Sequence, residues 1–173
     1  DYYNSENITY ELIDVRSPYE YSIDHIPGAL NFPALNNLER AEVGKIYNQN
    51  SFEAKKIGAA LICKNIAVYL ENTWKDKPKS WLPVIYCWRG GDRSKSVSHV
   101  LEKIGWKVLV LDGGYKAYRK YVLNCIPEYV NNLTLSVVCG LTGSGKTKFL
   151  DYLKSKKEQV LDLEGLALHR GSL

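Results

Sequence analysis

The stretch YCWRGGDRSKSVSHVLEKIG, residues 86–105, joins a cysteine-containing loop to a helical pattern. A cysteine is followed by two glycines and two arginines, and the apolar residues after them are spaced three, four and seven apart. That spacing is typical of the buried face of an amphipathic helix, and Gly105 is placed to end it. The stretch therefore predicts a thiol in a basic, glycine-rich loop that opens a helix near Ser94.

Short apolar runs alternate with longer helical patterns on both sides of this loop. Strands are predicted at residues 11–15, 81–87, 107–112 and 133–139. Helices are predicted at residues 39–48, 52–74, 115–123 and 146–157. Because continuous apolar strands alternate with helices, the fold class is α/β, with a parallel sheet flanked by helices.

Proline and paired asparagines interrupt the pattern in CIPEYVNNL, residues 125–133. We therefore expect a first domain at residues 1–130 and the beginning of a second at 131–173. The second unit has only about 40 residues, too few for an independent α/β domain. The chain contains no methionine, even at position 1, so it is expected to be a piece of a longer protein.

Composition limits the classes of function. No apolar run approaches the roughly 18 residues of a membrane span, and the first residues lack the charged and apolar regions of a signal peptide, so a cytoplasmic protein without membrane contact is expected. A net charge of +4 permits a nucleic-acid partner without requiring one. Four cysteines without CxxC spacing argue against zinc or a disulfide scaffold, and no metal site is predicted among them.

Cys87 is the candidate nucleophile. A free thiol has a pKa of about 8.5, so a reactive cysteine needs a surrounding that stabilises its thiolate. Amides curled by glycines, the start of a helix and the arginines Arg89 and Arg93 would all do so, and would also bind an anion. Cys87, Arg89 and Arg93 are the predicted catalytic residues. The predicted anion-binding loop adds Trp88, Gly90, Gly91, Asp92 and Ser94. The other three cysteines are expected to be buried and structural.

The segment upstream, LIDVRSPYEYSIDHIPGALNFP (residues 12–33), resembles the entry motif of rhodanese-like domains. The matching residues are Asp14, Arg16, Glu20, His25, Pro27, Gly28, Ala29 and Asn31. Together with GGYKAYR, residues 113–119, the resemblance covers about residues 10–123 and implies a rhodanese-like parallel sheet. It also implies a structural, hydrogen-bonding role for His25.

Arg93 stands six positions after Cys87, one more than is usual between the cysteine and arginine of ordinary single-domain rhodaneses. The longer CxxxxxR spacing resembles that of cysteine phosphatases, some of which have a rhodanese-like fold. A wider loop suits a tetrahedral phosphate or selenophosphate. The spacing leaves group transfer, as in a sulfurtransferase, and phosphatase chemistry with Asp92 as candidate general acid both open.

Residues 140–147, GLTGSGKT, match the phosphate-loop pattern GxxxxGK[ST] between a predicted strand and a predicted helix. Its glycine-rich backbone would wrap a di- or triphosphate, and Lys146 would reach the outer phosphates. Thr147 could bind Mg²⁺. The predicted phosphate-binding residues are Gly140, Gly143, Ser144, Gly145, Lys146 and Thr147.

The order of these motifs, followed by QVLDLEGLALHRGS at residues 159–172, resembles the family of tRNA 2-selenouridine synthases, and so does the insertion at residues 39–61. The resemblance spans nearly the whole chain and implies that it is an amino-terminal portion. It further implies an enzyme that replaces sulfur by selenium in the wobble 2-thiouridine of tRNA, with selenophosphate and geranyl diphosphate as substrates and no tightly bound cofactor.

Two matters stay open from the residues alone. Asp162, Glu164, His169 and Arg170 could act in catalysis or only complete the fold, and a non-catalytic, nucleotide-regulated binding module is an alternative to an enzyme. The oligomeric state is not predicted. Basic residues near the two motifs are candidates for contacts with tRNA phosphates: Lys116, Arg119, Lys120, Lys148, Lys154, Lys156 and Lys157.

Overall fold

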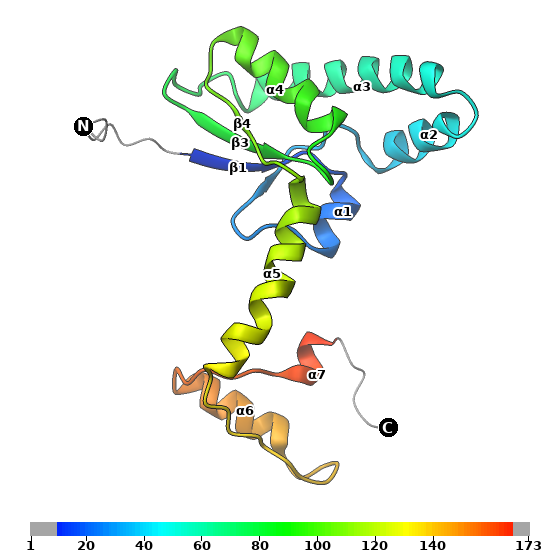
Figure 1. The fold of residues 1–173 in the computed structure, drawn as a ribbon. Coiled ribbons are helices and arrows are strands. Elements are labelled where there is room, and N and C mark those ends of the chain that lie inside the picture. Colours follow the sequence, from blue (N-terminus) through cyan, green and yellow to red (C-terminus); the bar gives the residue numbers. More distant parts are fainter. Residues whose placement is uncertain (1–9, 168–173) are drawn as a thin grey trace. The chain divides into compact units, whose positions relative to one another are not determined.

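The computed structural model describes residues 10–167 (Figure 1). The chain divides into two compact units between Glu128 and Tyr129. The first unit holds the elements β1 (Tyr10–Asp14), α1 (Pro18–Ile23), β2 (Leu30–Asn31), α2 (Asn37–Tyr47), α3 (Ser51–Asn72), β3 (Leu82–Tyr86), α4 (Asp92–Ile104) and β4 (Leu109–Val110). Helix α5 (Gly114–Asn131) begins in the first unit and passes the division, and α6 (Lys146–Ser155) and α7 (Leu163–Leu166) follow.

The strands form one parallel sheet in the order β2-β1-β3-β4. The two longer strands lie at its centre, with Ile13 of β1 opposite Ile85 of β3 and Asp14 opposite Tyr86. A buried parallel sheet needs cover on both faces, which explains why β1 and β3 are rich in apolar residues. The predicted α/β fold class is confirmed.

Successive residues of a strand point to opposite faces, so the sheet has two separate cores. Ile13 and Ile85 face the helices α3 and α4, which contribute Ile62, Ile66, Val97 and Leu101 to the larger cluster. Figure 1 shows these two helices on the same side of the sheet. Tyr86 faces the other way and packs with Tyr115 of α5 and partly buried residues of the α1 region.

Several elements differ from the expectation. The edge strand β4 has two residues where six were predicted, and β2 and α1 were not predicted. Helix α4 begins at Asp92, two residues before Ser94. Pro127 lies inside α5, which therefore continues through the segment predicted to interrupt the pattern. Proline removes one backbone N–H and can kink a helix without ending it.

The predicted strand at residues 133–139 is wrong for this chain. These residues form no strand, and no described segment pairs with them. Leu133, Leu135 and Val137 are 56%, 59% and 80% exposed. A strand exists only by hydrogen bonding to a neighbour, and its apolar faces need cover. The following helix is present as predicted, starting at Lys146 and ending at Ser155.

Among the helices of residues 10–167, none is both long enough and apolar enough to cross a membrane.

Candidate active site at the cysteine loop

Cys87 directly follows β3 and begins the cysteine loop, defined here as residues 87–94, which leads into α4. Its neighbour Tyr86 is fixed in the sheet, since the carbonyl of Tyr86 accepts a hydrogen bond from Val15 N at 3.0 Å. The thiol thus lies at the carboxyl end of a central parallel strand, where open α/β sheets commonly bind ligands.

Cys87 is the buried cysteine of the chain, with 3% of its surface exposed, whereas Cys63 and Cys139 are exposed and Cys125 is half-buried. The expectation of three buried structural cysteines is therefore wrong. Cys63 lies on the outer side of α3, between the buried residues Ile62 and Ile66. Cys139 lies in the segment that lacks a strand partner, so nothing described covers it.

The sulfur of Cys87 lies among hydrogen-bond donors. Gly91 N donates to Sγ at 3.2 Å, and the hydroxyl of Ser94 lies 3.3 Å away, where either atom can donate. Burial alone would raise the pKa of the Cys87 thiol. The Ser94 hydroxyl and the loop amides of Ser94, Arg89 and Gly91 outweigh burial and hold the pKa below its ordinary value. The loop therefore stabilises a thiolate through fixed dipoles, more than through the arginine charges invoked from the sequence.

Helix α5 holds the cysteine loop in shape. Its first amides donate to loop carbonyls, Tyr115 N to Cys87 O at 2.9 Å and Lys116 N to Trp88 O at 3.0 Å. These bonds hold the carbonyls of Cys87 and Trp88 on the α5 side of the loop, while Gly91 N donates to Sγ. The contact requires Gly114, where a Cβ atom would lie 2.3 Å from Cys87 O and where φ is +57°.

Arg93 contacts a glutamate in this structure. Its Nη1 lies 2.7 Å from Glu20 Oε2, and Arg40 Nε lies 2.9 Å from the same oxygen. Burial would raise the pKa of Glu20, but the hydrogen bond and charge of Arg93, with help from Ser17 N and Arg40, lower it to about 2. Glu20 therefore fixes the direction of Arg93, and α2 contributes one of the cations in this group.

The other predicted loop residues differ in their surroundings. Gly90 has φ +69°, and Gly91 caps α4 without a side-chain hydrogen bond. Trp88, Arg89 and Asp92 are exposed. The structure thus brings Cys87, Gly91 and Ser94 into contact and leaves Arg89 and Asp92 at the surface of the loop.

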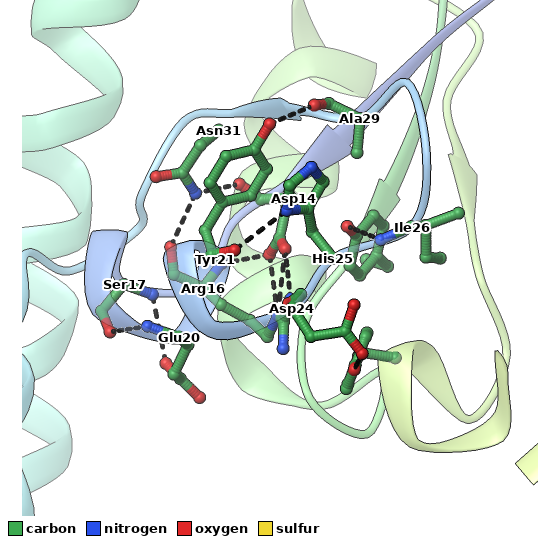
Figure 2. A network of polar contacts seen from close by, with 12 residues as sticks. Asp14, Arg16, Ser17, Glu20, Tyr21, Asp24, His25, Ile26, Ala29 and Asn31 are labelled. Carbon is green, nitrogen blue, oxygen red and sulfur yellow. Dashed lines mark hydrogen bonds and ion pairs between the residues drawn. The ribbon is translucent and has the colours of Figure 1, made fainter. Parts of the chain in front are cut away.

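A buried polar network supports the site from the entry motif (Figure 2). Arg16 binds the carboxylate of Asp14 through Nε and Nη2, at 2.7 Å for the shortest contact, and also donates to Asp24 O at 2.7 Å. The guanidinium carbon lies 3.9 Å from the ring centroid of Tyr115, whose hydroxyl donates to the carboxylate of Asp24. This network therefore fixes Tyr115, whose backbone N–H donates to Cys87 O and anchors the cysteine loop.

The sequence indicated Asp14 and Arg16 through the family motif but not Asp24 or Tyr115. Tyr115 is the third residue of GGYKAYR, so its position next to the motif was the available signal. His25 Nδ1 lies 2.9 Å from Tyr21 O, and its ring stacks on that of Tyr21. These contacts agree with the structural role expected for His25.

The phosphate-loop motif lies in the second unit, where Gly143 and Gly145 adopt positive φ angles of +79° and +84°. Gly140 leaves room for Ser144, whose hydroxyl would lie 2.7 Å from an added Cβ. Lys146 donates to the carbonyls of Gly140 and Leu141 at 2.8 and 2.9 Å, so its amine spans the loop. Thr147 is the second residue of α6 and is exposed.

Asp162 caps α7 and accepts a hydrogen bond from Gly165 N at 3.0 Å, which lowers the pKa of its carboxyl, with Lys154 3.6 Å away. Glu164 lies in the first turn of α7 and is exposed. His169 and Arg170 lie outside the described residues. Within residues 10–167, no group of three histidine, cysteine, aspartate or glutamate side chains could hold a metal ion. A magnesium ion here would depend on Thr147 and on phosphate oxygens of a ligand.

Comparison with known proteins defines the class. Residues 2–121 match the family model of the rhodanese-like domain, so the chain belongs to the rhodanese-like family. Residues 133–173 match the model described as the tRNA 2-selenouridine synthase AAA domain.

The particular relatives are tRNA 2-selenouridine synthases, which confirms the resemblance expected from the motifs. Those of Bdellovibrio bacteriovorus and Nitrosomonas eutropha are 43% and 40% identical over 93% of this chain. The chain spans 42% of the length of either relative. The crystal structure of the N-terminal domain of a putative ATP/GTP binding protein from Clostridium difficile 630 has a TM-score of 0.58 and 40% identity. That match covers 66% of this chain and 89% of the other.

Proposed function

We propose that this chain is the cysteine-bearing part of a tRNA 2-selenouridine synthase, which replaces sulfur by selenium in wobble 2-thiouridine with selenophosphate as donor. The observation that carries the proposal is the buried thiol of Cys87, with Gly91 N at 3.2 Å and the Ser94 hydroxyl at 3.3 Å. Donors of this kind favour the thiolate, which is the nucleophilic form of cysteine. The names of the relatives in both parts of the chain support tRNA as the substrate.

In this proposal, the loop binds selenophosphate and the Cys87 thiolate attacks its phosphorus, so that an S–P bond forms, the P–Se bond breaks and selenide is released as the nucleophile for C2 of the base. Water then hydrolyses the S-phosphocysteine and releases phosphate. The amides that stabilise a thiolate also stabilise negative charge that develops on the transferred group. Arg89 is exposed at the loop surface, and Arg93 is fixed by Glu20 at 2.7 Å. Arg89 thus lies where it would meet the incoming selenophosphate first.

The phosphate loop would serve the geranyl step. Transfer of the geranyl group from geranyl diphosphate to the thiocarbonyl sulfur forms a C–S bond and releases diphosphate, which suits the amides of Gly143 to Lys146. The alkylated sulfur then leaves from C2 with its geranyl group as the selenium nucleophile adds. To bind a diphosphate, Lys146 would exchange its hydrogen bonds with Gly140 O and Leu141 O for phosphate oxygens.

A paired assay tests the proposal. Full-length protein that contains this chain is incubated with 2-thiouridine-containing tRNA and selenophosphate, and the release of phosphate from an aryl phosphate is measured in parallel. We expect selenouridine in the tRNA and no turnover of the aryl phosphate. Turnover of the aryl phosphate without selenouridine would favour a phosphatase. Neither product, with nucleotide binding retained, would favour a binding module.

A further inference from the structure

Trp88 is an exposed aromatic residue directly beside the candidate nucleophile. It follows Cys87 in the chain, and 39% of its surface is exposed. The other tryptophans of the chain are Trp74 and Trp81, at 0% and 4% exposure, and Trp106, whose Nε1 donates to Pro78 O. A core role explains those three residues but not Trp88.

The position of Trp88 is nevertheless fixed. Its carbonyl accepts a hydrogen bond from Lys116 N at 3.0 Å, and its ring lies 5.5 Å from that of Tyr115. Tyr115 is itself 1% exposed and is held by Arg16 and Asp24. An exposed ring with rigid support loses little entropy when a second ring stacks on it.

The surroundings of Trp88 are basic. Within residues 87–94 and 111–120, the exposed charged side chains are Arg89, Lys116, Arg119 and Lys120 against Asp92 and Asp112. Lys116 and Lys120 are four residues apart and therefore share one face of α5. Aromatic rings beside basic side chains are how proteins bind unpaired RNA bases, with the ring stacking on the base and the cations meeting phosphates.

We propose that Trp88 is the stacking platform for the nucleobase that reacts at Cys87, and that Lys116 and Lys120 bind the adjoining phosphates of the same single-stranded RNA segment. The inference rests on the proposed function, because it takes tRNA as the substrate. It assigns to this chain the recognition of the unpaired base itself, next to the reactive sulfur.

Tryptophan fluorescence of this 173-residue chain tests whether a nucleobase stacks on Trp88. The signal of Trp88 is obtained as the difference between wild type and Trp88→Phe. The probe is an RNA stem–loop with 2-thiouridine at the wobble position, compared with the same RNA with an abasic residue there. We expect quenching of Trp88 by the first RNA only. We also expect Trp88→Ala to weaken binding at least fivefold, with Trp88→Phe within about threefold of wild type. Equal quenching by both RNAs, or unchanged affinity of Trp88→Ala, would overturn the inference.

Two controls separate stacking from misfolding and from a failure of the proposed function. Tyr47→Ala removes an aromatic side chain that is 53% exposed on α2, and it should leave binding unchanged. In full-length protein, Trp88→Ala should raise KM for tRNA at least fivefold, and by more than it changes KM for selenophosphate. If wild type forms no selenouridine, the proposed function fails, while the RNA-binding comparison still decides the stacking.

Discussion

At Cys87, burial and hydrogen bonding act on the thiol in opposite directions, and hydrogen bonding prevails. The residue is 3% exposed, so a charge there must be stabilised by fixed donors and not by water. Gly91 N is one such donor, and the Ser94 hydroxyl, which also lies 3.1 Å from Gly91 O, is the other when its proton turns toward Sγ. The reactivity of the thiol therefore depends on Ser94, a residue without charge.

We predict that Ser94→Ala raises the pKa of Cys87 and slows its alkylation by iodoacetamide at pH 7 by roughly tenfold. A hydrogen bond to a charged group contributes about 1.5 kcal/mol, and its loss corresponds to a factor of about ten. Mass spectrometry of the Cys87 peptide across pH 5–9 measures both. Ser98→Ala is the matched control, since Ser98 is buried in the same helix and its hydroxyl donates to Lys95 O. An unchanged pH profile in Ser94→Ala would refute the role of this donor.

Glu20 contributes to acid stability. Its pKa of about 2, against 4.5 for the free group, means that the ion pairs with Arg93 and Arg40 stabilise the fold above about pH 4.5. This contribution is lost as pH falls toward 2. We predict that Glu20→Gln lowers the free energy of unfolding at pH 6 by about 1–2 kcal/mol, because Arg40 is half exposed and the pair is screened. The difference from wild type should shrink toward pH 3 in urea titrations. Glu53→Gln, at an exposed pair, should show neither effect.

At the scale of elements, the join between α5 and the cysteine loop is the critical contact. We predict that Gly114→Ala destabilises the protein by about 2 kcal/mol or more, since its Cβ would overlap Cys87 O and φ is +57°. Gly44→Ala in α2, where an added Cβ meets nothing within 4 Å, should instead stabilise by about 0.5–1 kcal/mol. Thermal unfolding of both variants decides this. Equal stability of the two would contradict the close packing described for Gly114.

The sequence predicted the elements whose signal is local and missed those that depend on partners. The apolar runs of β1 and β3 and the periodicity of α4 are visible in the chain because these residues are buried. The short β2 forms because Leu30 and Asn31 pair with Ile13 and Asp14, which apolar pattern alone does not reveal. Residues 133–139 have a strand-like sequence, but without a neighbour they form no strand.

The site was predictable to a similar degree. Cys87, the glycines and Ser94 follow from the motif, whereas the contact of Arg93 with Glu20 joins residues 73 positions apart. Only the folded chain shows that the helix carrying Arg40 reaches the same carboxylate. The sequence predicted that the charges of the arginines stabilise the Cys87 thiolate. In the structure, the Ser94 hydroxyl and backbone amides, which are neutral donors, lower the pKa of this thiol.

At the scale of the whole molecule, the second unit exposes apolar residues of its phosphate-loop segment, and Lys146 donates to the loop carbonyls of Gly140 and Leu141. A phosphate loop binds tightly only when its surroundings hold it in place. We predict that geranyl diphosphate binds this chain at least tenfold more weakly than it binds the full-length enzyme of Bdellovibrio bacteriovorus. Calorimetry on both, with Lys146→Ala as the control in this chain, measures the difference; equal affinities would show that these 173 residues build the site alone.

Cys87 is the proposed reacting group of a selenium transferase that acts on tRNA. The decisive measurement is mass spectrometry of tRNA nucleosides after incubation of full-length protein with selenophosphate and 2-thiouridine-containing tRNA. Wild type should convert 2-thiouridine to 2-selenouridine, and Cys87→Ser should reduce this conversion at least a hundredfold. Cys63→Ser is the control, because it replaces an exposed cysteine on α3, and it should convert as wild type does. Undiminished selenouridine formation by a folded Cys87→Ser variant would show that Cys87 is not the reacting group.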